Sequence, residues 1–476
     1  MKAPSTTAIV TLATVLLYTG ALVWWHLYTP HSDLEASLPG ADNRPADLAR
    51  AADDVRIGEF FMKYDVPFTS GDKSGVFPSF RGAGRDNIIH SDIPLNTQGD
   101  FPILWEVTTG EGHAAPVIYK GRVYILDYDE PLLSDMLRCI DLESGGELWR
   151  RWYRVRMKRN HGFSRTVPAV GDGFVVTLGP SGQLMCCDPL TGDLLWSRDL
   201  GKEYGTEVPF WYTGQCPLID GNEVIVAPAG KEALLAGYDL RTGEELWSTP
   251  NSPSFTMSHS SVMPMVLGGK KTYVYVGIGG VCGVSAALPD KGKLLWSTER
   301  WQPSVVAPSP VRMSSGRIFL VAGYGNGGAV LQVSGEGGQW NARILEAYKA
   351  DKGFSSEQQT PILYGGKFYG IIPKDGGPLR ERLVQYDPSD LHHPLWSSGP
   401  EERFGLGPYM IINDVMLVLA EEGTLFLYKM NEGGVPTLIR KQEVFEAIDA
   451  WGPLCYADGR LLVRDSHRVL CLKVDS

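Results

Sequence analysis

The sequence predicts an all-β fold in which eight four-stranded sheets form a closed ring, a β-propeller. Three observations support this prediction: a repeating unit, a matching series of unit ends, and one strand that lies upstream of the first unit. A unit of four short strands cannot bury both of its faces alone, so neighbouring units must stack. Closing the stack into a ring removes the exposed edges that an open array would leave.

The repeating unit is clearest at residues 168–196, PAVGDGFVVTLGPSGQLMCCDPLTGDLLW. Turns that contain glycine separate β-branched and aromatic runs, which is typical of short strands. A proline that opens the first strand recurs every 45 to 52 residues, at Pro116, Pro168, Pro217, Pro264, Pro310, Pro361, Pro408 and Pro453. These prolines predict eight units.

The ends of the units give an independent count. A D-x-x-[ST]-G-x-x-L-W pattern occurs at 141–149, 188–196 and 239–247, weaker copies end at 296 and 396, and degenerate ends are expected near 339–348 and 435–441. Each Trp is expected to pack between adjacent sheets, where burying about 200 Å² contributes a few kcal/mol. The blade-docking residues are therefore Trp105, Trp149, Trp196, Trp247, Trp296 and Trp396.

The last unit stops after its third strand, which is expected over 468–474. Residues 103–107, Ile-Leu-Trp-Glu-Val, carry the same Leu-Trp signature but precede the first unit. We expect this N-terminal strand to complete the C-terminal sheet and to close the ring.

The N-terminus predicts one transmembrane helix over residues 8–28, which hold no acidic or basic residue except His26. Such a helix spans about 31 Å, close to the roughly 30 Å of a hydrocarbon core. A cleaved signal peptide is the alternative, but the apolar run is long for one and no clear A-x-A site follows. We expect a signal anchor in the cytoplasmic membrane, with residues 1–7 inside and the propeller in the periplasm or outside the cell.

Residues 29–76 are expected to form a spacer, with a short helix over 47–61, and residues 77–476 to form the propeller. The spacer would lift the propeller off the membrane, and a docking helix for a partner is the alternative interpretation.

The seven cysteines give no disulfide framework. Ten residues before four of the signature tryptophans lies a small residue: Cys139, Cys186, Gly237 or Ala286. We expect a small side chain to be required there, where neighbouring sheets converge. The adjacent pair Cys186-Cys187 is therefore predicted to belong to the core.

The units resemble the pyrroloquinoline-quinone (PQQ) repeat, whose mark is a D-x-x-T-G-x-x-L-W turn and strand. Residues 77–150, with Phe80-Arg81-Gly82, Arg85-Asp86 and Leu104-Trp105-Glu106, resemble the N-terminal part of PQQ-like propellers. The resemblance covers about 400 residues and implies the fold more specifically than the function. The family includes quinoprotein dehydrogenases that bind PQQ and Ca²⁺ on the axis, and cofactor-free scaffolds such as the propeller subunit of the outer-membrane β-barrel assembly machinery.

We expect the chain to be closer to the cofactor-free type. Alcohol-oxidising quinoproteins carry a vicinal cysteine pair beside the cofactor, but the register of Cys186-Cys187 within a strand argues against that role. PQQ and Ca²⁺ need converging Asp, Asn, Glu and Arg residues and a Trp that stacks on the quinone. No such set is evident in the sequence, so no cofactor is predicted.

The residues just before the strand-opening prolines are expected to rim the central channel. These binding candidates are His113, His161, Arg165, Trp211, His259, Gln358, Gln359 and Trp451. A water-filled channel and a small-molecule or peptide pocket are both open interpretations. Three separated histidines also leave a metal site open as an interpretation, although no metal ligand is predicted.

One basic run stands out in a chain whose net charge is −11. It extends the outer strand of the first unit and consists of Arg150, Arg151, Arg154, Arg156, Lys158 and Arg159. Alternation places Arg151, Tyr153 and Val155 on one face. The run is interpreted either as a solvated edge that resists edge-to-edge pairing, or as a contact for an anionic partner or lipid headgroup.

Together these features predict a membrane-anchored, extracytoplasmic scaffold that binds other envelope proteins without catalysis. No catalytic residue is predicted, and the acidic balance argues against a nucleic-acid partner. The alternatives are a quinoprotein-like oxidoreductase with PQQ at the axis, and a carbohydrate- or peptide-binding module.

Overall fold

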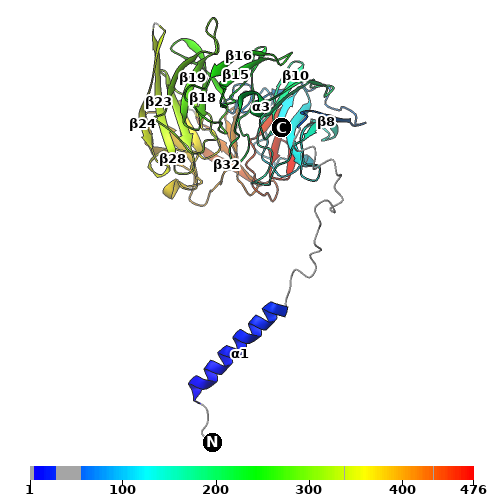
Figure 1. Ribbon diagram of the computed structural model, residues 1–476, viewed down its shortest axis with the longest axis vertical. Coiled ribbons are helices and arrows are strands. Elements are labelled where there is room, and N and C mark those ends of the chain that lie inside the picture. Colours follow the sequence, from blue (N-terminus) through cyan, green and yellow to red (C-terminus); the bar gives the residue numbers. More distant parts are fainter. Residues whose placement is uncertain (1–4, 28–54, 337, 432–433, 476) are drawn as a thin grey trace. The chain divides into compact units, whose positions relative to one another are not determined.

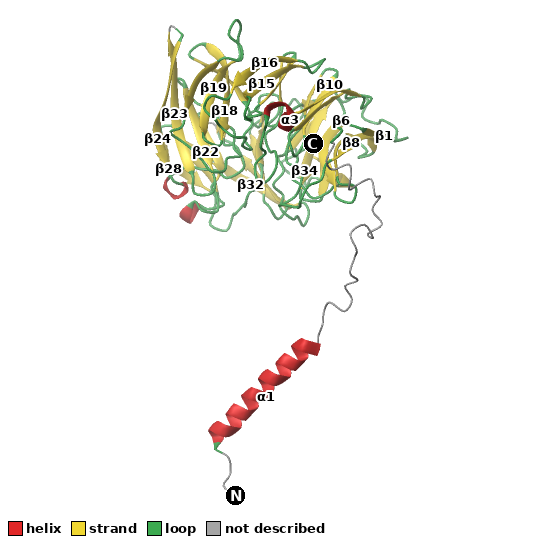
Figure 2. Cartoon of the chain, viewed as in Figure 1, coloured by secondary structure: helices red, strands yellow, loops and turns green. Residues whose placement is uncertain are grey.

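The computed structural model describes residues 5–27, 55–336, 338–431 and 434–475, which fall into two separate units, an N-terminal helix and an all-β body (Figures 1 and 2). Of the predicted spacer, residues 29–54 lie outside the described residues, as does Tyr28 at the end of the predicted span.

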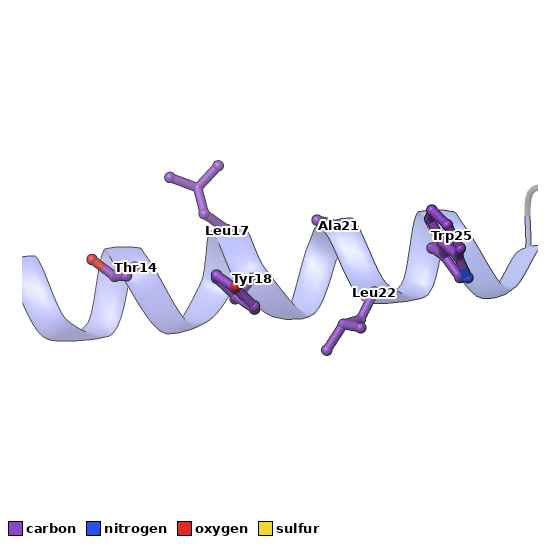
Figure 3. A pocket seen from close by; sticks show the side chains of 6 residues that line it. All are labelled: Thr14, Leu17, Tyr18, Ala21, Leu22 and Trp25. Carbon is purple, nitrogen blue, oxygen red and sulfur yellow. The ribbon is translucent and has the colours of Figure 1, made fainter. Parts of the chain in front are cut away.

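The helix α1 (Thr6–Leu27) has 22 residues and is apolar on all sides. Its segment Val10–Leu27 contains no Asp, Glu, Lys or Arg and is long enough to cross a membrane. Leu17 and Leu22 project from opposite edges of the helix, and Trp25 lies near its C-terminal end (Figure 3). A helix without a polar face suits a lipid environment or a signal sequence.

The described part of the body contains eight sheets that follow one another along the chain, as predicted, and the four strands of each blade pair antiparallel. Blade 1 consists of β5 (Val117–Tyr119), β6 (Arg122–Asp129), β7 (Ser134–Asp141) and β8 (Glu147–Arg154), and blade 2 of β9 (Ala169–Gly171), β10 (Phe174–Leu178), β11 (Gln183–Cys187) and β12 (Leu194–Asp199). Blade 3 consists of β13 (Leu218–Asp220), β14 (Glu223–Val226), β15 (Ala233–Asp239) and β16 (Glu245–Pro250), and blade 4 of β17 (Met263–Leu267), β18 (Lys270–Gly277), β19 (Gly280–Ser285) and β20 (Leu294–Thr298).

The remaining four blades repeat this arrangement. Blade 5 consists of β21 (Val311–Arg312), β22 (Arg317–Ala322), β23 (Gly327–Glu336) and β24 (Gln339–Tyr348), and blade 6 of β25 (Ile362–Tyr364), β26 (Lys367–Ile371), β27 (Leu383–Asp387) and β28 (Asp390–Ser397). Blade 7 consists of β29 (Tyr409–Ile412), β30 (Val415–Leu419), β31 (Thr424–Lys429) and β32 (Thr437–Glu443), and blade 8 begins with β33 (Cys455–Ala457), β34 (Arg460–Arg464) and β35 (Arg468–Lys473). The two degenerate unit ends are thus true outer strands, β24 and β32.

The ring closes as the sequence predicts. Strand β4 (Ile103–Thr108) pairs antiparallel with β35, and Trp105 lies opposite Cys471. In Figure 1 the cyan N-terminal strand and the red C-terminal strands lie side by side. Every blade therefore has four strands, and blade 8 takes its outer strand from the other end of the body.

The tryptophans pack between blades because the turn of the next blade offers a glycine. A Cβ added to Gly145 would lie 2.6 Å from the Trp105 ring, and one added to Gly243 would lie 2.5 Å from the Trp196 ring. Both glycines also have a left-handed backbone, with φ of 71° and 69°, which glycine adopts without steric cost. The signature glycine therefore serves its own turn and the neighbouring blade together.

The predicted small-residue position is confirmed for three blades and wrong for one. Cys139, Cys186 and Gly237 lie opposite the tryptophans of their own blades. In blade 4 the residue opposite Trp296 is Gly283 rather than Ala286. The longer turn before β20 shifts the register by three residues, and a Cβ on Gly283 would lie 2.3 Å from the Trp296 ring.

The two adjacent cysteines belong to the core. Successive strand residues point to opposite faces, so Cys186 packs in the cluster that holds Trp196 while Cys187 packs in the cluster that holds Trp149. All seven cysteines are buried with free thiols. Burial raises the pKa of Cys187 to about 12, which keeps the thiol unreactive.

The expected spacer is too long, because its described end packs on the propeller. Strand β1 (Phe60–Lys63) pairs antiparallel with β8, the outer strand of blade 1. Leu148 of β8 is consequently only 9% exposed, whereas the matching Leu195 and Leu246 are 43% and 49% exposed. The helix expected over 47–61 is wrong in its described part, 55–61, where Phe60 begins this strand; residues 47–54 lie outside the described residues.

Three short helices and two further strands complete the body. The helices are α3 (Leu200–Tyr204), η1 (Ala350–Lys352) and η2 (Gly377–Leu379), and the strands are β2 (Val76–Phe77) and β3 (Ile88–Ile89). Strands β2 and β3 pair with β5 and β29, the first strands of blades 1 and 7.

Candidate functional site

One cavity of about 370 Å³ lies where the connections between blades meet at the axis. All eight channel residues expected from the sequence line it: His113, His161, Arg165, Trp211, His259, Gln358, Gln359 and Trp451. They come from six connections, each of which returns the chain from an outer strand to the next inner strand. The structure therefore brings the whole predicted set together.

The cavity also has lining residues that the sequence analysis missed. Tyr324 follows β22 and Lys374 follows β26, so both lie in turns between the second and third strands of a blade. The chain reverses direction at each strand, which puts these turns on the same face as the blade-to-blade connections. The alternating direction of the strands could therefore have identified Tyr324 and Lys374 as candidates. Glu357 was missed as well, although it is adjacent to Gln358 in the sequence.

Residues 78–87, which connect β2 to β3, cross the axis and close one end of the cavity. Arg81 donates to the Pro361 carbonyl in blade 6, Arg85 to the Ile219 carbonyl in blade 3, and Asn87 to the Tyr409 carbonyl in blade 7. Phe80 lines the cavity. The axial channel is thus a blind pocket with a floor from the N-terminal segment.

Arg165 is a fixed cation in the cavity wall. Its Nε donates to the Trp211 carbonyl at 2.6 Å, and its Nη2 donates to the carbonyls of Asn160 and His161, each at 2.7 Å. Burial lowers the pKa of Arg165 to about 10, so the guanidinium stays charged at neutral pH. The main chain of two blade connections therefore holds this side chain in place.

His113 and Trp451, with ring centroids 4.8 Å apart, form the part of the wall next to Arg165. His113 Nε2 donates to the His161 carbonyl at 3.2 Å, because a carbonyl oxygen only accepts. Burial and the charge of Arg165 lower the pKa of His113 to about 3. The same two causes lower the pKa of His259 to about 4. Both imidazoles are neutral at physiological pH.

An aromatic pair lies beside Arg165. The rings of Trp211 and Tyr324 are stacked at 5.7 Å, and Phe210 meets Trp211 edge-on at 5.4 Å. Phe210 is 78% exposed and lines a second, neighbouring hollow of about 250 Å³. The hollow shares the lining residues Trp211, His259 and Val305 with the central cavity, so the two adjoin.

The third side of the cavity is acidic and amide-rich. Burial, then the charge of Asp375, raises the pKa of Glu357. Gln359 donates to the Trp451 carbonyl at 3.0 Å, and the Trp451 indole donates to Glu421 at 3.1 Å. Lys374 Nζ lies 4.0 Å from the same Glu421 carboxylate. The cavity therefore combines one fixed guanidinium, neutral hydrogen-bonding groups and aromatic faces.

The donor set does not fit PQQ with Ca²⁺. Calcium takes six to eight oxygen ligands, mostly carboxylates and carbonyls. Among the described residues that line the cavity, Glu357 supplies the carboxylate, and neither Asp nor Asn lines it. The described chain also contains no group of three or more His, Cys, Asp or Glu residues placed to hold a metal ion, so the three histidines do not form such a group.

The basic run does not form one patch. Arg151 lies on the buried face with Tyr153 and Val155, as alternation predicts, and donates to the carbonyls of Gly192 and Gly58. Arg150 pairs with Glu147, and Arg154 lies over the Phe60 ring. Arg159 pairs with Glu111, while Arg156 and Lys158 are exposed. Strand β1 pairs with residues 149–152 of β8, so this part of the expected solvated edge is covered.

These features define a PQQ-like β-propeller with a blind axial cavity. The PQQ_2 family, described as outer membrane protein assembly factor BamB, matches residues 133–390, more than half of the chain. The chain therefore belongs to this family. No curated protein sequence matches it.

Solved structures show the same fold at low identity. A europium-containing methanol dehydrogenase aligns with a TM-score of 0.57 and 11% identity, over 85% of this chain and 99% of its own. Quinohemoprotein alcohol dehydrogenase from Comamonas testosteroni aligns with a TM-score of 0.55 and 13% identity, over 90% and 84%. BamB from Moraxella catarrhalis aligns with a TM-score of 0.50 and 12% identity, over 79% and 100%. At these identities the likeness concerns the fold.

Proposed function

We propose that the protein is a non-enzymatic scaffold of the cell envelope that binds a segment of a partner protein at the mouth of its central cavity. Helix α1 anchors it in the cytoplasmic membrane with the N-terminus inside, so the propeller acts in the periplasm or outside the cell. The family described as an outer membrane assembly factor is consistent with such a role.

The observation that supports this proposal most is the apolar rim of the cavity. Phe210 is exposed although it is large and aromatic, and the hollow beside it is lined by Pro209, Ile278 and Val305. Exposed aromatic residues beside a concave apolar surface are typical of protein-binding sites. A rim of this kind offers contact area for a chain that lies across the mouth.

An oxidoreductase is the second candidate, because two dehydrogenases share the fold. Arg165 and Trp211 are residue types that could contact a quinone carboxylate and ring. The shortage of oxygen ligands around Glu357 argues against this candidate, because the cation that assists quinone chemistry would lack its coordination shell.

Site-specific photo-crosslinking tests the scaffold proposal. A benzoylphenylalanine in place of Phe210 reports on the mouth, and one in place of Leu288 is the matched control, since Leu288 is 83% exposed in a turn between third and fourth strands on the opposite face. In membranes of the source organism, we expect a discrete protein adduct from position 210 alone. Equal adducts from both positions, or none from either, would count against a partner at the mouth.

A further inference from the structure

We infer that the central cavity takes a carboxylate from an acidic segment of the partner protein, and that Arg165 binds this carboxylate. An apolar side chain next to the acidic residue then lies in the hollow beside Phe210. This inference rests on the proposed function and specifies the chemistry of the segment.

Arg165 carries the positive charge on which this inference depends, and the Glu111 charge is among those that act on it. No carboxylate among the described residues forms an ion pair with it, and its three hydrogen bonds all go to main-chain carbonyls through Nε and Nη2. Nη1 has no acceptor in the described part of the chain and is not among the fully buried atoms. Because the side chain is largely desolvated, an anion at Nη1 would form a charge-assisted hydrogen bond of above-average strength.

Five of the other titratable groups that line the cavity are less suited to this role than Arg165. His113 and His259 are neutral, and Lys374 lies beside Glu421. Glu357 faces the cavity too, but burial favours its uncharged form. Tyr324 also lines the cavity, and its ring stacks on Trp211 at 5.7 Å. The anion is therefore expected at Arg165.

The apolar hollow favours a peptide over a free anion. It adjoins the central cavity at Trp211, His259 and Val305 and reaches Phe210, and Glu207 is the acidic residue in its lining. An inorganic anion would use Arg165 and leave this surface uncovered. A peptide with an acidic residue beside an aromatic or aliphatic residue covers both parts, with the carboxylate inside and the apolar side chain on the rim.

The test is isothermal titration calorimetry on the full-length protein in detergent. The probes are acetyl-Phe-Asp-Phe-amide, its matched control acetyl-Phe-Asn-Phe-amide, and inorganic phosphate. We expect the Asp peptide to bind about 10-fold more tightly than the Asn peptide, which is the effect of one charge-assisted hydrogen bond. R165Q should remove this preference, and E357Q should retain or increase it because it removes an acid from the same cavity.

W211A keeps the protein testable if R165Q does not fold. It removes an aromatic face shared by the cavity and the hollow but leaves the guanidinium, so we expect weaker binding of both peptides with the Asp preference retained. Equal affinity for the two peptides, or phosphate bound as tightly as the Asp peptide, would overturn the inference. If the preference is missing but the Phe210 crosslink persists, the acidic class is wrong and the scaffold proposal stands.

Discussion

The indole Nε1 of Trp105 donates a hydrogen bond of 2.8 Å to the carbonyl oxygen of Leu142. Trp105 lies in β4, the outer strand of blade 8, and Leu142 follows β7 in blade 1, so this bond crosses the point where the ring closes. The Trp105 ring also covers Gly145 in the same turn. The interface between the first and last blades thus uses the same Trp-to-turn packing as other blade interfaces; Trp196 donates to the Leu240 carbonyl at 2.9 Å.

Replacing Trp105 should open the closure. W105A removes a buried aromatic side chain and its hydrogen bond, and we expect a loss of about 3–5 kcal/mol in unfolding free energy. Denaturant unfolding followed by circular dichroism measures it. L288A, at an exposed turn, should cost less than about 0.5 kcal/mol. A W105A protein as stable as L288A would show that the closure does not depend on this contact.

A side chain at position 237 should be costly. A Cβ on Gly237 would lie 2.3 Å from the Trp247 ring in the same blade, so G237A forces the indole or the strand to move, and we expect a loss of about 1–3 kcal/mol. G71A is the matched control, because nothing lies within 4 Å of its added Cβ. The melting temperatures of G237A and G71A measure the difference in stability. Equal melting temperatures would show that position 237 has room for a side chain beside Trp247.

The pairing of β1 with blade 1 should be visible in hydrogen exchange. F61A removes the ring that lies 4.7 Å from the Arg151 guanidinium, so the amide of Tyr64, which donates to the Leu148 carbonyl at 3.0 Å, should exchange about 10-fold faster. The amides of β11, at the centre of blade 2, are the internal reference and should be unchanged. An unprotected Tyr64 amide in the wild-type protein would refute the pairing.

Asp135 should make stability depend on pH. Burial raises the pKa of Asp135 from 3.8 to about 7, although Tyr153 donates to it and Ser164 lies near; the charge of Asp127 adds to the rise. Because its pKa is raised, Asp135 holds its proton more tightly in the folded state than in the unfolded chain. The protonated carboxyl therefore contributes to the unfolding free energy below pH 4, and this contribution is lost as the pH rises to 7. D135N stays neutral and can still accept from Tyr153.

The unfolding free energy of D135N relative to the wild type should therefore increase by on the order of 3 kcal/mol between pH 4 and pH 7. Urea unfolding at a series of pH values measures the difference. A difference that stays constant over this range would mean that Asp135 titrates in the folded protein as it does in the unfolded chain.

The ring could be predicted from the sequence because each blade repeats its own turn chemistry. The count of eight, the outer strand at Trp105 and the cavity residues all follow from periodic prolines, glycines and tryptophans. Ala286 was misplaced because the turn of blade 4 is longer, which changes which residue lies opposite Trp296.

The segments outside the repeat could not be predicted in this way. Strand β1 and the floor at Phe80 occur once each, so no sibling segment reveals their partners. Their contacts join residues far apart in the chain, such as Arg81 with Pro361. Tyr324 and Lys374 were missed for another reason: only the residues before the prolines were expected at the mouth, while the turns on the same face were left out.

If the cavity receives a protein segment and not a redox cofactor, the protein should not bind PQQ. The most direct measurement is a titration of the full-length protein with PQQ and Ca²⁺, followed by absorbance and by dye-linked oxidation of alcohols and sugars, with R165Q in parallel. We expect no stoichiometric PQQ binding and no dye reduction. Tight, stoichiometric PQQ binding that R165Q abolishes, together with dye reduction, would contradict it.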